Sequence, residues 1–410
     1  MRLVPLAATA LTLGLAAACG ANGQTAPADA SKAGVPLETR PANGAGQTPA
    51  FAGQTRAPAA TTSVGMTHTV VASGLDHPWG LALMPDGRWL VTERSGRMSI
   101  ISPDGAKGPA IAGLPRVDAR GQGGLLDVVV SPDFASDRMI YWSYAEPREG
   151  GNGTAVARGV LSADGARVDQ VQVIFRAMPT YDGDKHFGSS LAFAPDGKLF
   201  ITLGERSDKP MRPQAQDLGS HMGKVIRINA DGSVPQDNPY VGQAGAKPEI
   251  WSLGHRNVQG IAIAPDGKIW TIEHGTRGGD EVNLDRAGVN YGWPDAAYGI
   301  EYAGGAINAG ATQKEGTEQP VYFWDPVIAP GGAAIYSGAM FPGWAGNLLV
   351  AGLKEKQIAR LVIQNDRVVG EERLLTDLGE RIRDVAVGPD GAVWAITDEA
   401  NGKLVRLSAS

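Results

Sequence analysis

Residues 81–91 read Leu-Ala-Leu-Met-Pro-Asp-Gly-Arg-Trp-Leu-Val, which is two apolar runs on either side of a Pro-Asp-Gly turn. Pro sets φ for the first corner of such a turn, Gly accepts a positive φ near its end, and Asp bonds nearby backbone N–H groups. The flanking runs alternate in polarity or are apolar throughout. The stretch therefore predicts a buried antiparallel hairpin.

The same pattern recurs along the chain. Close copies follow at residues 191–201, 261–272 and 385–396, and degenerate copies at residues 128–142 and 335–350. Repeats spaced by about 50 to 75 residues, each with several strands, are typical of propeller blades. We therefore predict an all-β protein, a six-bladed β-propeller with four-stranded antiparallel blades. A large sandwich or two small β domains is the alternative.

The composition excludes several classes of protein. The chain has 410 residues, of which 56 are Gly and 27 Pro, with 43% hydrophobic and 20% charged residues. These values exclude a coiled coil, a collagen-like rod and a wholly disordered chain. A net charge of −6 without basic runs argues against nucleic acid as a partner. The single Cys excludes an intramolecular disulfide framework and a Cys-based zinc site.

The N-terminus indicates export. Residues 1–19 have the pattern of a signal peptide, with Arg2 before the apolar run Leu3 to Ala18, and Cys19 sits where a bacterial lipoprotein would be cleaved and lipidated. Ordinary signal cleavage with an incidental Cys is the alternative. We expect an exported protein, periplasmic or membrane-anchored by an N-terminal lipid. Residues 20–63 are rich in Ala, Gly, Pro and Thr and predict a flexible tether. Residues 64–410 would form the propeller catalytic domain.

Polar motifs stand just before or just after the hairpins, at positions that converge on the axis of a propeller. The cationic or donor side chains among them suit a small ligand with several carboxylates or phosphates; these are His186, Arg256, Lys354, Arg381 and Arg383. Asp280 and Glu281, beside the Gly-rich residues 275–279, suggest a Ca²⁺ site.

His186 is the best candidate base, because imidazole titrates near neutral pH. Each of these features also has a structural interpretation: a hydrogen-bonded His at a strand entrance, a solvated face for Arg381 and Arg383, and a tight loop at residues 275–279. From the residues alone, an enzyme and a binding protein both remain open.

Seven motifs, taken in order, carry a resemblance to a known family. They are Gly-Gln-Gly-Gly-Leu-Leu (121–126), His-Phe-Gly-Ser (186–189), Gly-His-Arg-Asn (254–257), Glu-His-Gly with Arg-Gly-Gly-Asp-Glu (273–281), Asn-Tyr-Gly-Trp-Pro (290–294), Leu-Lys (353–354) and Arg-Ile-Arg-Asp (381–384). From about Gly74 to Leu407 the chain resembles the soluble PQQ-dependent aldose sugar dehydrogenases, the relatives of soluble quinoprotein glucose dehydrogenase.

The resemblance implies a six-bladed propeller that holds pyrroloquinoline quinone (PQQ) and Ca²⁺ and oxidises aldose sugars at C1 to lactones, with hydride transfer to the quinone. His186 would be the general base. The implied cofactor-binding residues are Gln122, Arg256, Asn257, Tyr302, Gly352, Leu353, Lys354, Arg381 and Arg383. The carbonyls of Gly275 and Thr276 would bind the catalytic Ca²⁺, and Glu281 with the carbonyl of Tyr291 a further Ca²⁺. Electrons would pass to a quinone or soluble acceptor, and the protein would be a monomer or homodimer.

General chemistry agrees with these roles. A tricarboxylate needs Arg and Lys around a desolvated pocket. Nearby Ca²⁺ and Arg would depress the pKa of His186, so activity should be lost below about pH 6. Three residues depart from the family pattern, namely Lys185, Ser190 and Thr276.

Two other functions stay open from the sequence. One is a Ca²⁺-dependent lactonase that would use acidic residues such as Glu93, Glu205 and Glu273. The other is a non-catalytic propeller that binds glycans or proteins.

Overall fold

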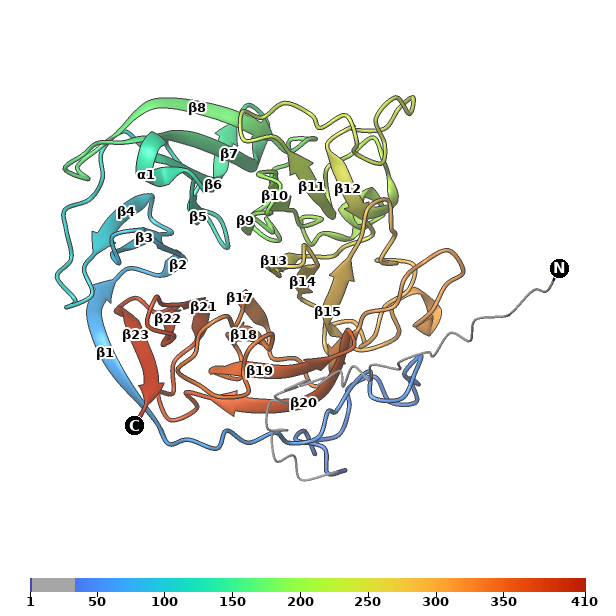
Figure 1. Ribbon diagram of the computed structural model, residues 1–410. Helices are drawn as coiled ribbons and strands as arrows, with labels where there is room; N and C mark the ends of the chain where they lie inside the picture. The colour runs from blue at the N-terminus through green and yellow to red at the C-terminus, as the bar shows by residue number, and fades with distance from the viewer. Residues whose placement is uncertain (2–33) are drawn as a thin grey trace.

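The six repeated stretches form the first hairpins of six antiparallel sheets, arranged as blades around an axis (Figure 1). In this computed structural model, which describes Met1 and residues 34–410, the glycines that end the four clear Pro-Asp-Gly turns have φ between 77° and 84°. They are Gly87, Gly197, Gly267 and Gly391. Side chains other than Gly rarely adopt such values, so the turn residues fix where each hairpin reverses.

The blades follow one another in chain order. Blade 1 consists of β2 (Pro78–Leu83), β3 (Trp89–Glu93) and β4 (Arg97–Ile101); blade 2 of β5 (Leu125–Val130), β6 (Met139–Arg148), β7 (Gly151–Leu161) and β8 (Val168–Arg176); and blade 3 of β9 (Leu191–Phe193), β10 (Leu199–Thr202), β11 (Lys224–Ile228) and β12 (Ile250–Leu253). Blade 4 consists of β13 (Val258–Ile263), β14 (Ile269–Glu273), β15 (Asp280–Asp285) and β16 (Tyr322–Trp324); and blade 5 of β17 (Pro330–Ile335), β18 (Leu348–Gly352), β19 (Gln357–Gln364) and β20 (Arg367–Leu374). Blade 6 consists of β21 (Ile382–Val387), β22 (Val393–Thr397), β23 (Gly402–Ala409) and β1 (Met66–Leu75).

Strand β1 closes the ring. It pairs antiparallel with β23, from Met66 opposite Ala409 to Leu75 opposite Gly402, so the start of the domain completes its last blade. The predicted six-bladed, four-stranded propeller is therefore confirmed. Blade 1 is the exception to the strand number, because the described residues beyond β4 form isolated bridges there. The helical segments are short: α1 (Phe134–Asp137) and two 3-10 turns, Lys209–Gln216 and Asn308–Gly310.

Hydroxyl groups tie neighbouring blades together near the axis. In blade 3, Thr202 accepts the N–H of Ser190 at 2.9 Å and donates to the carbonyl of Val258, in blade 4, at 2.9 Å. Thr92 and Ser143 join blades 1 and 2 to their neighbours in the same way. Between these seams, buried apolar side chains of adjacent blades pack together. The innermost strands are thus held in fixed positions around the axis.

Residues 35–63, which we call the strap, lie along the outer side of blades 4 and 5 (Figure 1). Gln54 and Ala57 are buried, and backbone bonds join Phe323 N–H to the carbonyl of Gln54 (2.8 Å) and Ala60 N–H to that of Glu371 (2.8 Å). Over residues 34–63 the structure therefore contradicts the prediction of a flexible tether, which was made for residues 20–63. Hydrogen bonds secure this segment, although it has few large apolar side chains.

The expected signal peptide, Cys19 and residues 20–33 lie outside the described residues. Within residues 34–410, the helices are all too short or too polar to cross a membrane.

Candidate functional site

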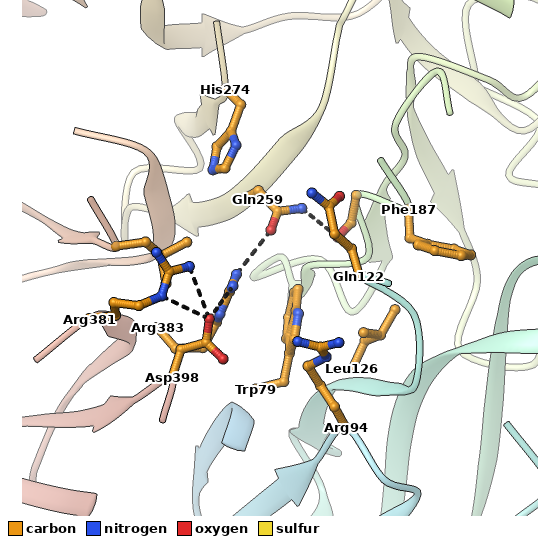
Figure 2. Close-up of a pocket in the computed structure, with 12 residues that line it drawn as sticks. Trp79, Arg94, Gln122, Leu126, Phe187, Gln259, His274, Arg381, Arg383 and Asp398 are labelled. Atoms are coloured by element: carbon orange, nitrogen blue, oxygen red, sulfur yellow. Dashed lines mark hydrogen bonds and ion pairs between the residues drawn. The ribbon is translucent and has the colours of Figure 1, made fainter. Parts of the chain in front are cut away.

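All six blades contribute side chains to one cavity of about 120 Å³, which must therefore lie on the propeller axis (Figure 2). We call it the axial cavity. Its walls are Trp79 and Arg94 from blade 1, Gln122 and Leu126 from blade 2, Phe187 and Gly188 from blade 3, Gln259 and His274 from blade 4, Leu353 from blade 5, and Arg381, Arg383 and Asp398 from blade 6.

The axial cavity carries an excess of positive charge. Three of its walls are arginines, whereas Asp398 is the one carboxylate among them. The Nη2 atoms of Arg381 and Arg383 lie 3.1 and 3.2 Å from Oδ2 of Asp398. Burial of Asp398 favours its neutral form, but these two guanidinium groups hold the pKa of its carboxyl group well below the usual range. Asp398 is therefore ionised. Two of the three positive charges share one negative charge, which leaves the cavity suited to an anion.

Arg383 is the most deeply placed of these cations. Burial lowers the pKa of its guanidinium. Nη1 donates to Oε1 of Gln259 at 3.1 Å, and Nε has no hydrogen-bond partner among the described residues. A buried donor without a partner is costly, so an acceptor brought by a ligand would be favoured at this point.

His186 lies directly behind the cavity wall. It is 4% exposed, its backbone N–H donates to Oε1 of Gln122 at 2.8 Å, and Nδ1 lies 2.8 Å from Oε2 of Glu205. Burial and the charge of Arg256 lower the pKa of the imidazole. The ring is therefore neutral near neutral pH.

The partner of Nδ1 sets the tautomer of His186. Burial favours the neutral acid at Glu205, but His186 and Arg256 outweigh it and lower the pKa of this carboxyl group. An ionised carboxylate only accepts hydrogen bonds, so Nδ1 carries the proton of the neutral ring and Nε2 keeps its lone pair. This is the arrangement of a histidine that can accept a proton.

A second, smaller cavity of about 10 Å³ adjoins the first, because His274 lines both. It lies around residues 275–279, which we call the metal loop. All four residues that the sequence assigned to metal line it, namely Gly275, Thr276, Glu281 and Tyr291. Arg256 also lines it and donates to the carbonyls of His274 (3.0 Å) and Gly275.

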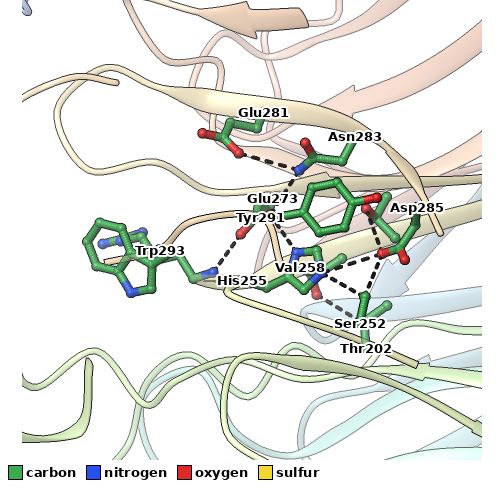
Figure 3. A network of polar contacts seen from close by, with 12 residues as sticks. Thr202, Ser252, His255, Val258, Glu273, Glu281, Asn283, Asp285, Tyr291 and Trp293 are labelled. Atoms are coloured by element: carbon green, nitrogen blue, oxygen red, sulfur yellow. Dashed lines mark hydrogen bonds and ion pairs between the residues drawn. The ribbon is translucent and has the colours of Figure 1, made fainter. Parts of the chain in front are cut away.

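A buried polar network supports this loop cavity (Figure 3). His255 lies between Oε1 of Glu273 (2.8 Å from Nδ1) and Oδ2 of Asp285 (3.4 Å from Nε2), and its ring stacks on Tyr291 with centroids 4.8 Å apart. Although burial opposes it, the two carboxylates raise the pKa of His255 to about 10. This cation balances negative charge beneath the cavity. Burial and the charge of Glu273 raise the pKa of Glu281 well above its ordinary value.

Asp280 departs from its expected role as a metal ligand. Its Oδ1 accepts the N–H of Gly275 at 2.8 Å, and its Oδ2 accepts that of Ala329 at 2.7 Å. Burial raises the pKa of this carboxyl group to about 7. Asp280 therefore holds the metal loop in place through the backbone.

The family model described as Glucose / Sorbosone dehydrogenase matches residues 75–406. This chain belongs to that family. It is 44% identical over 343 residues to aldose sugar dehydrogenase YliI of Escherichia coli, spanning 83% of this chain and 92% of that protein. The resemblance stated from the sequence motifs is thereby confirmed, and the chain is a homologue of a sugar dehydrogenase.

Two solved structures extend the comparison. The apo-form of the soluble aldose sugar dehydrogenase of Escherichia coli is 43% identical, with a TM-score of 0.81, over 84% of this chain and 100% of that one. The PQQ-bound form of an aldose sugar dehydrogenase from Streptomyces coelicolor is 27% identical, with a TM-score of 0.69, over 85% of this chain and 100% of that one.

The structure brings most of the expected family residues together. Gln122, Leu353, Arg381 and Arg383 line the axial cavity, and the metal residues with Arg256 line the loop cavity. Asn257 is buried behind the axial cavity, where its Oδ1 accepts the N–H of Gly188 at 3.1 Å.

Three further expected cofactor residues line neither cavity. The hydroxyl of Tyr302 is 3.3 Å from Nη2 of Arg256, although Tyr302 is 63% exposed. Gly352 is the buried last residue of β18, and Lys354 is exposed two residues further on.

The structure explains two of the departures from the family pattern. The Lys185 side chain is 54% exposed and lies 3.3 Å from Asp184, while its carbonyl accepts Nε of Arg206 at 2.9 Å. The second cation acting on the imidazole is therefore Arg206, which helps lower the pKa of His186 after burial and Arg256. Ser190 belongs to the seam between blades, where its Oγ donates to Asp127 at 3.2 Å.

Several residues that line the axial cavity were given no role in the site from the sequence. Leu126, Phe187 and His274 stand within the quoted motifs, whereas Trp79, Arg94, Gln259 and Asp398 do not. Arg94, His274 and Asp398 share a positional signal, because each follows the second strand of a blade directly. Glu205 occupies a related place after β10, and the sequence offered it only for the lactonase alternative.

The acidic residues of that alternative are each engaged elsewhere. Glu93 lies 2.8 Å from Nζ of Lys107, Glu205 binds His186, and Glu273 binds His255. Residues 34–410 contain no group of three or more His, Cys, Asp or Glu side chains placed to hold a metal. Any Ca²⁺ here would depend on backbone carbonyls as well as carboxylates.

The residues present fit both groups that the family implies. The positive axial cavity suits the carboxylates of PQQ. The loop cavity offers hard oxygen donors for Ca²⁺: the carboxylate of Glu281, the loop carbonyls, and Oγ1 of Thr276, which is buried without a partner among the described residues. Gly275 is required in this loop, since a Cβ there would collide with the backbone of Gly278 and Gly279.

Proposed function

We propose that this protein oxidises aldose sugars at C1 to lactones, with PQQ and Ca²⁺ as cofactors. The observation that carries the proposal is the axial cavity, where arginines from blades 1 and 6 meet next to a neutral imidazole. The relatives named as aldose sugar dehydrogenases, one of them PQQ-bound, support the same activity.

In this proposal His186 is the general base. Nε2 accepts the proton of the C1 hydroxyl, since Nδ1 is committed to Glu205 at 2.8 Å. The carboxylate of Glu205 then stabilises the imidazolium that forms and keeps the ring in one orientation. Glu205 is thus a positioning residue that acts through His186.

The arginines and Gln122 would hold the cofactor. Arg94, Arg381 and Arg383 would bind its carboxylates, with Arg256 in the wall of the loop cavity and Asn257 behind the axial cavity. When bound, PQQ supplies the two-electron acceptor and Ca²⁺ the Lewis acid that makes it electrophilic. The carbonyls of Gly275 and Thr276 and the carboxylate of Glu281 would hold the metal.

Dye-linked oxidation of sugars tests this function. The purified protein should reduce a redox dye with aldoses only after PQQ and Ca²⁺ are added. His186→Ala should lower the rate at least about 100-fold. His68→Ala, on the outer strand β1, is the matched control and should keep the wild-type rate. Hydrolysis of lactones by PQQ-free protein, without any dye reduction, would overturn the proposal in favour of the lactonase alternative.

We further propose that the protein is exported, that Cys19 is lipidated, and that electrons pass to a quinone or a soluble carrier. The sequence of residues 1–19 supports export. In the native host, wild-type protein should fractionate with membranes and Cys19→Ser should not. Membrane release of the wild-type protein by mild salt alone would argue against the lipid anchor.

A further inference from the structure

Several hydrogen bonds join the strap to residues that lie against the metal loop. The first is Gln47, whose Nε2 donates to the carbonyl of Gly299 at 2.9 Å while its Oε1 accepts the N–H of Gly299 at 2.7 Å. Gly299 packs directly on Gly278, because a Cβ at Gly299 would collide with the Gly278 carbonyl. Gln47 thereby holds both polar backbone groups of a residue in contact with the metal loop.

The second contact passes through Asp325. Its two carboxylate oxygens accept the N–H groups of Asn43 and Gly44, each at 2.8 Å, and Asn43 Nδ2 at 2.7 Å. The same carboxylate packs on Gly278, where a Cβ would lie 2.7 Å from Oδ1. Arg277, within the metal loop, donates from Nε to Oδ1 of Asn43 at 3.1 Å. One strap residue thus bonds to the loop itself and to the side chain packed against it.

The third contact reaches the wall of the loop cavity. Tyr298 lines that cavity, and its hydroxyl accepts the N–H of Ala50, in the strap, at 3.2 Å. The same hydroxyl lies 3.0 Å from Oε1 of the fully buried Gln54 and 2.8 Å from Oε1 of Gln319. The Tyr298 ring stacks on Phe323 with centroids 3.9 Å apart. The Tyr298 carbonyl lies so close to Gly279 that a Cβ there would collide with it. Ala50 and Gln54 of the strap therefore help to fix the aromatic wall from outside.

We propose that the strap is a positioning element for the metal loop, which sets its affinity for Ca²⁺. Gly278 and Gly279 have φ of 93° and 82°, and such glycine-rich backbone has many conformations to lose when it binds a ligand. Contacts that fix the loop beforehand reduce this cost, so the metal binds more tightly. The strap lies outside the residues 75–406 that the family shares, so this control is an addition to the family domain. The inference rests on the metal site of the proposed function.

The test compares two strap variants of the full chain. Gln47→Ala removes both bonds to Gly299. Thr62→Val is the control. Thr62 lies at the C-terminal end of the strap and bonds to Glu372 at 2.6 Å and to Trp344 at 2.9 Å, neither of which belongs to the metal loop. Ca²⁺ alone is titrated by calorimetry into PQQ-free, Ca²⁺-depleted protein. Amide hydrogen exchange of residues 275–279 is followed without added metal.

Gln47→Ala should raise the Kd for Ca²⁺ at least about fivefold and speed exchange of the metal loop at least about tenfold. Thr62→Val should change either quantity less than about twofold. Gln47→Glu, which keeps the acceptor but cannot donate to the Gly299 carbonyl, should give intermediate values and guards against misfolding of the alanine variant.

Wild-type affinity and wild-type exchange in Gln47→Ala would overturn the proposal, as would equal changes in Thr62→Val. If the wild-type chain bound no Ca²⁺, the metal assignment of the proposed function would fail. The exchange rates would still decide whether the strap holds the loop, so the two failures are distinguishable.

Discussion

At His186, burial and the guanidinium of Arg256 disfavour the imidazolium, whereas the carboxylate of Glu205 favours it, and the net pKa lies below 6.5. Because the pKa of the imidazolium is lowered, the ring is neutral at pH 7 and can accept a proton. It loses this competence only as the pH falls through the lowered pKa. The acid limit of activity is thus a property of three neighbouring side chains.

The pH profile tests this balance. The kcat of the reconstituted enzyme should fall on the acid side with an apparent pKa below 6.5, the ordinary value of the ring. In Glu205→Gln the acid limb of the pH profile should move to still lower pH, because a charge that favours the imidazolium is removed. The kcat of this variant should also drop at least about tenfold. Glu146→Gln, on β6 where Glu146 pairs with Arg148 and Arg176, should leave the profile unchanged. An acid limb that stays fixed in Glu205→Gln would contradict this account of His186.

Arg383 offers a test of the positive axial cavity. Arg383→Gln should raise the Kd for PQQ at least about tenfold, because a charge-assisted hydrogen bond to a carboxylate contributes about 1.5–3 kcal/mol. Arg406→Gln is the matched control, since Arg406 lies on β23 and pairs with Asp390 away from the cavity. Fluorescence titration with PQQ measures both. Equal affinity in the two variants would show that Arg383 does not bind the cofactor.

The sequence predicted Arg381 and Arg383 better than it predicted the residue that binds them both. Arg381 and Arg383 stand in a recognisable motif, so their convergence on the axis could be inferred from the repeat. Asp398, which binds both, is an isolated acid after a strand and carries no motif of its own. The backbone-holding role of Asp280 could not be predicted for a related reason, because its bonds to backbone N–H groups depend on a loop conformation that no spacing reveals.

At the scale of elements, the hairpins were predictable and the strap was not. A Pro-Asp-Gly turn between apolar runs specifies its structure locally, and all six copies became the first two strands of a blade. The strap has no such pattern. Its order depends on amide side chains such as Gln47 and Gln54, whose partners lie more than 200 residues away in sequence.

The packing between blades gives a prediction for stability. Trp142 on β6 is fully buried in the cluster shared by blades 1 and 2. Trp142→Ala should reduce the free energy of unfolding by about 3–5 kcal/mol, because it leaves a large cavity. Val171→Ala, at an exposed position of β8, should change it by less than about 0.5 kcal/mol. Urea denaturation of the PQQ-free proteins measures both, and similar midpoints in the two variants would contradict the blade-to-blade core.

For the whole molecule, the closed ring explains how motifs spread from residue 79 to residue 398 can line one cavity. Blades 1 to 4 each contribute two residues to the axial cavity, blade 5 contributes one, and blade 6 contributes three. Pairing of β1 with β23 keeps these contributions in register around the axis. Function at the axis therefore depends on the integrity of the entire ring.

An absorbance titration with PQQ in the presence of Ca²⁺, followed by addition of an aldose, is the decisive experiment for the proposed activity. We expect saturable binding with one PQQ per chain, and conversion of the bound cofactor from its oxidised to its reduced spectrum when sugar is added. A spectrum that remains that of free oxidised PQQ at saturating Ca²⁺ and sugar would contradict it.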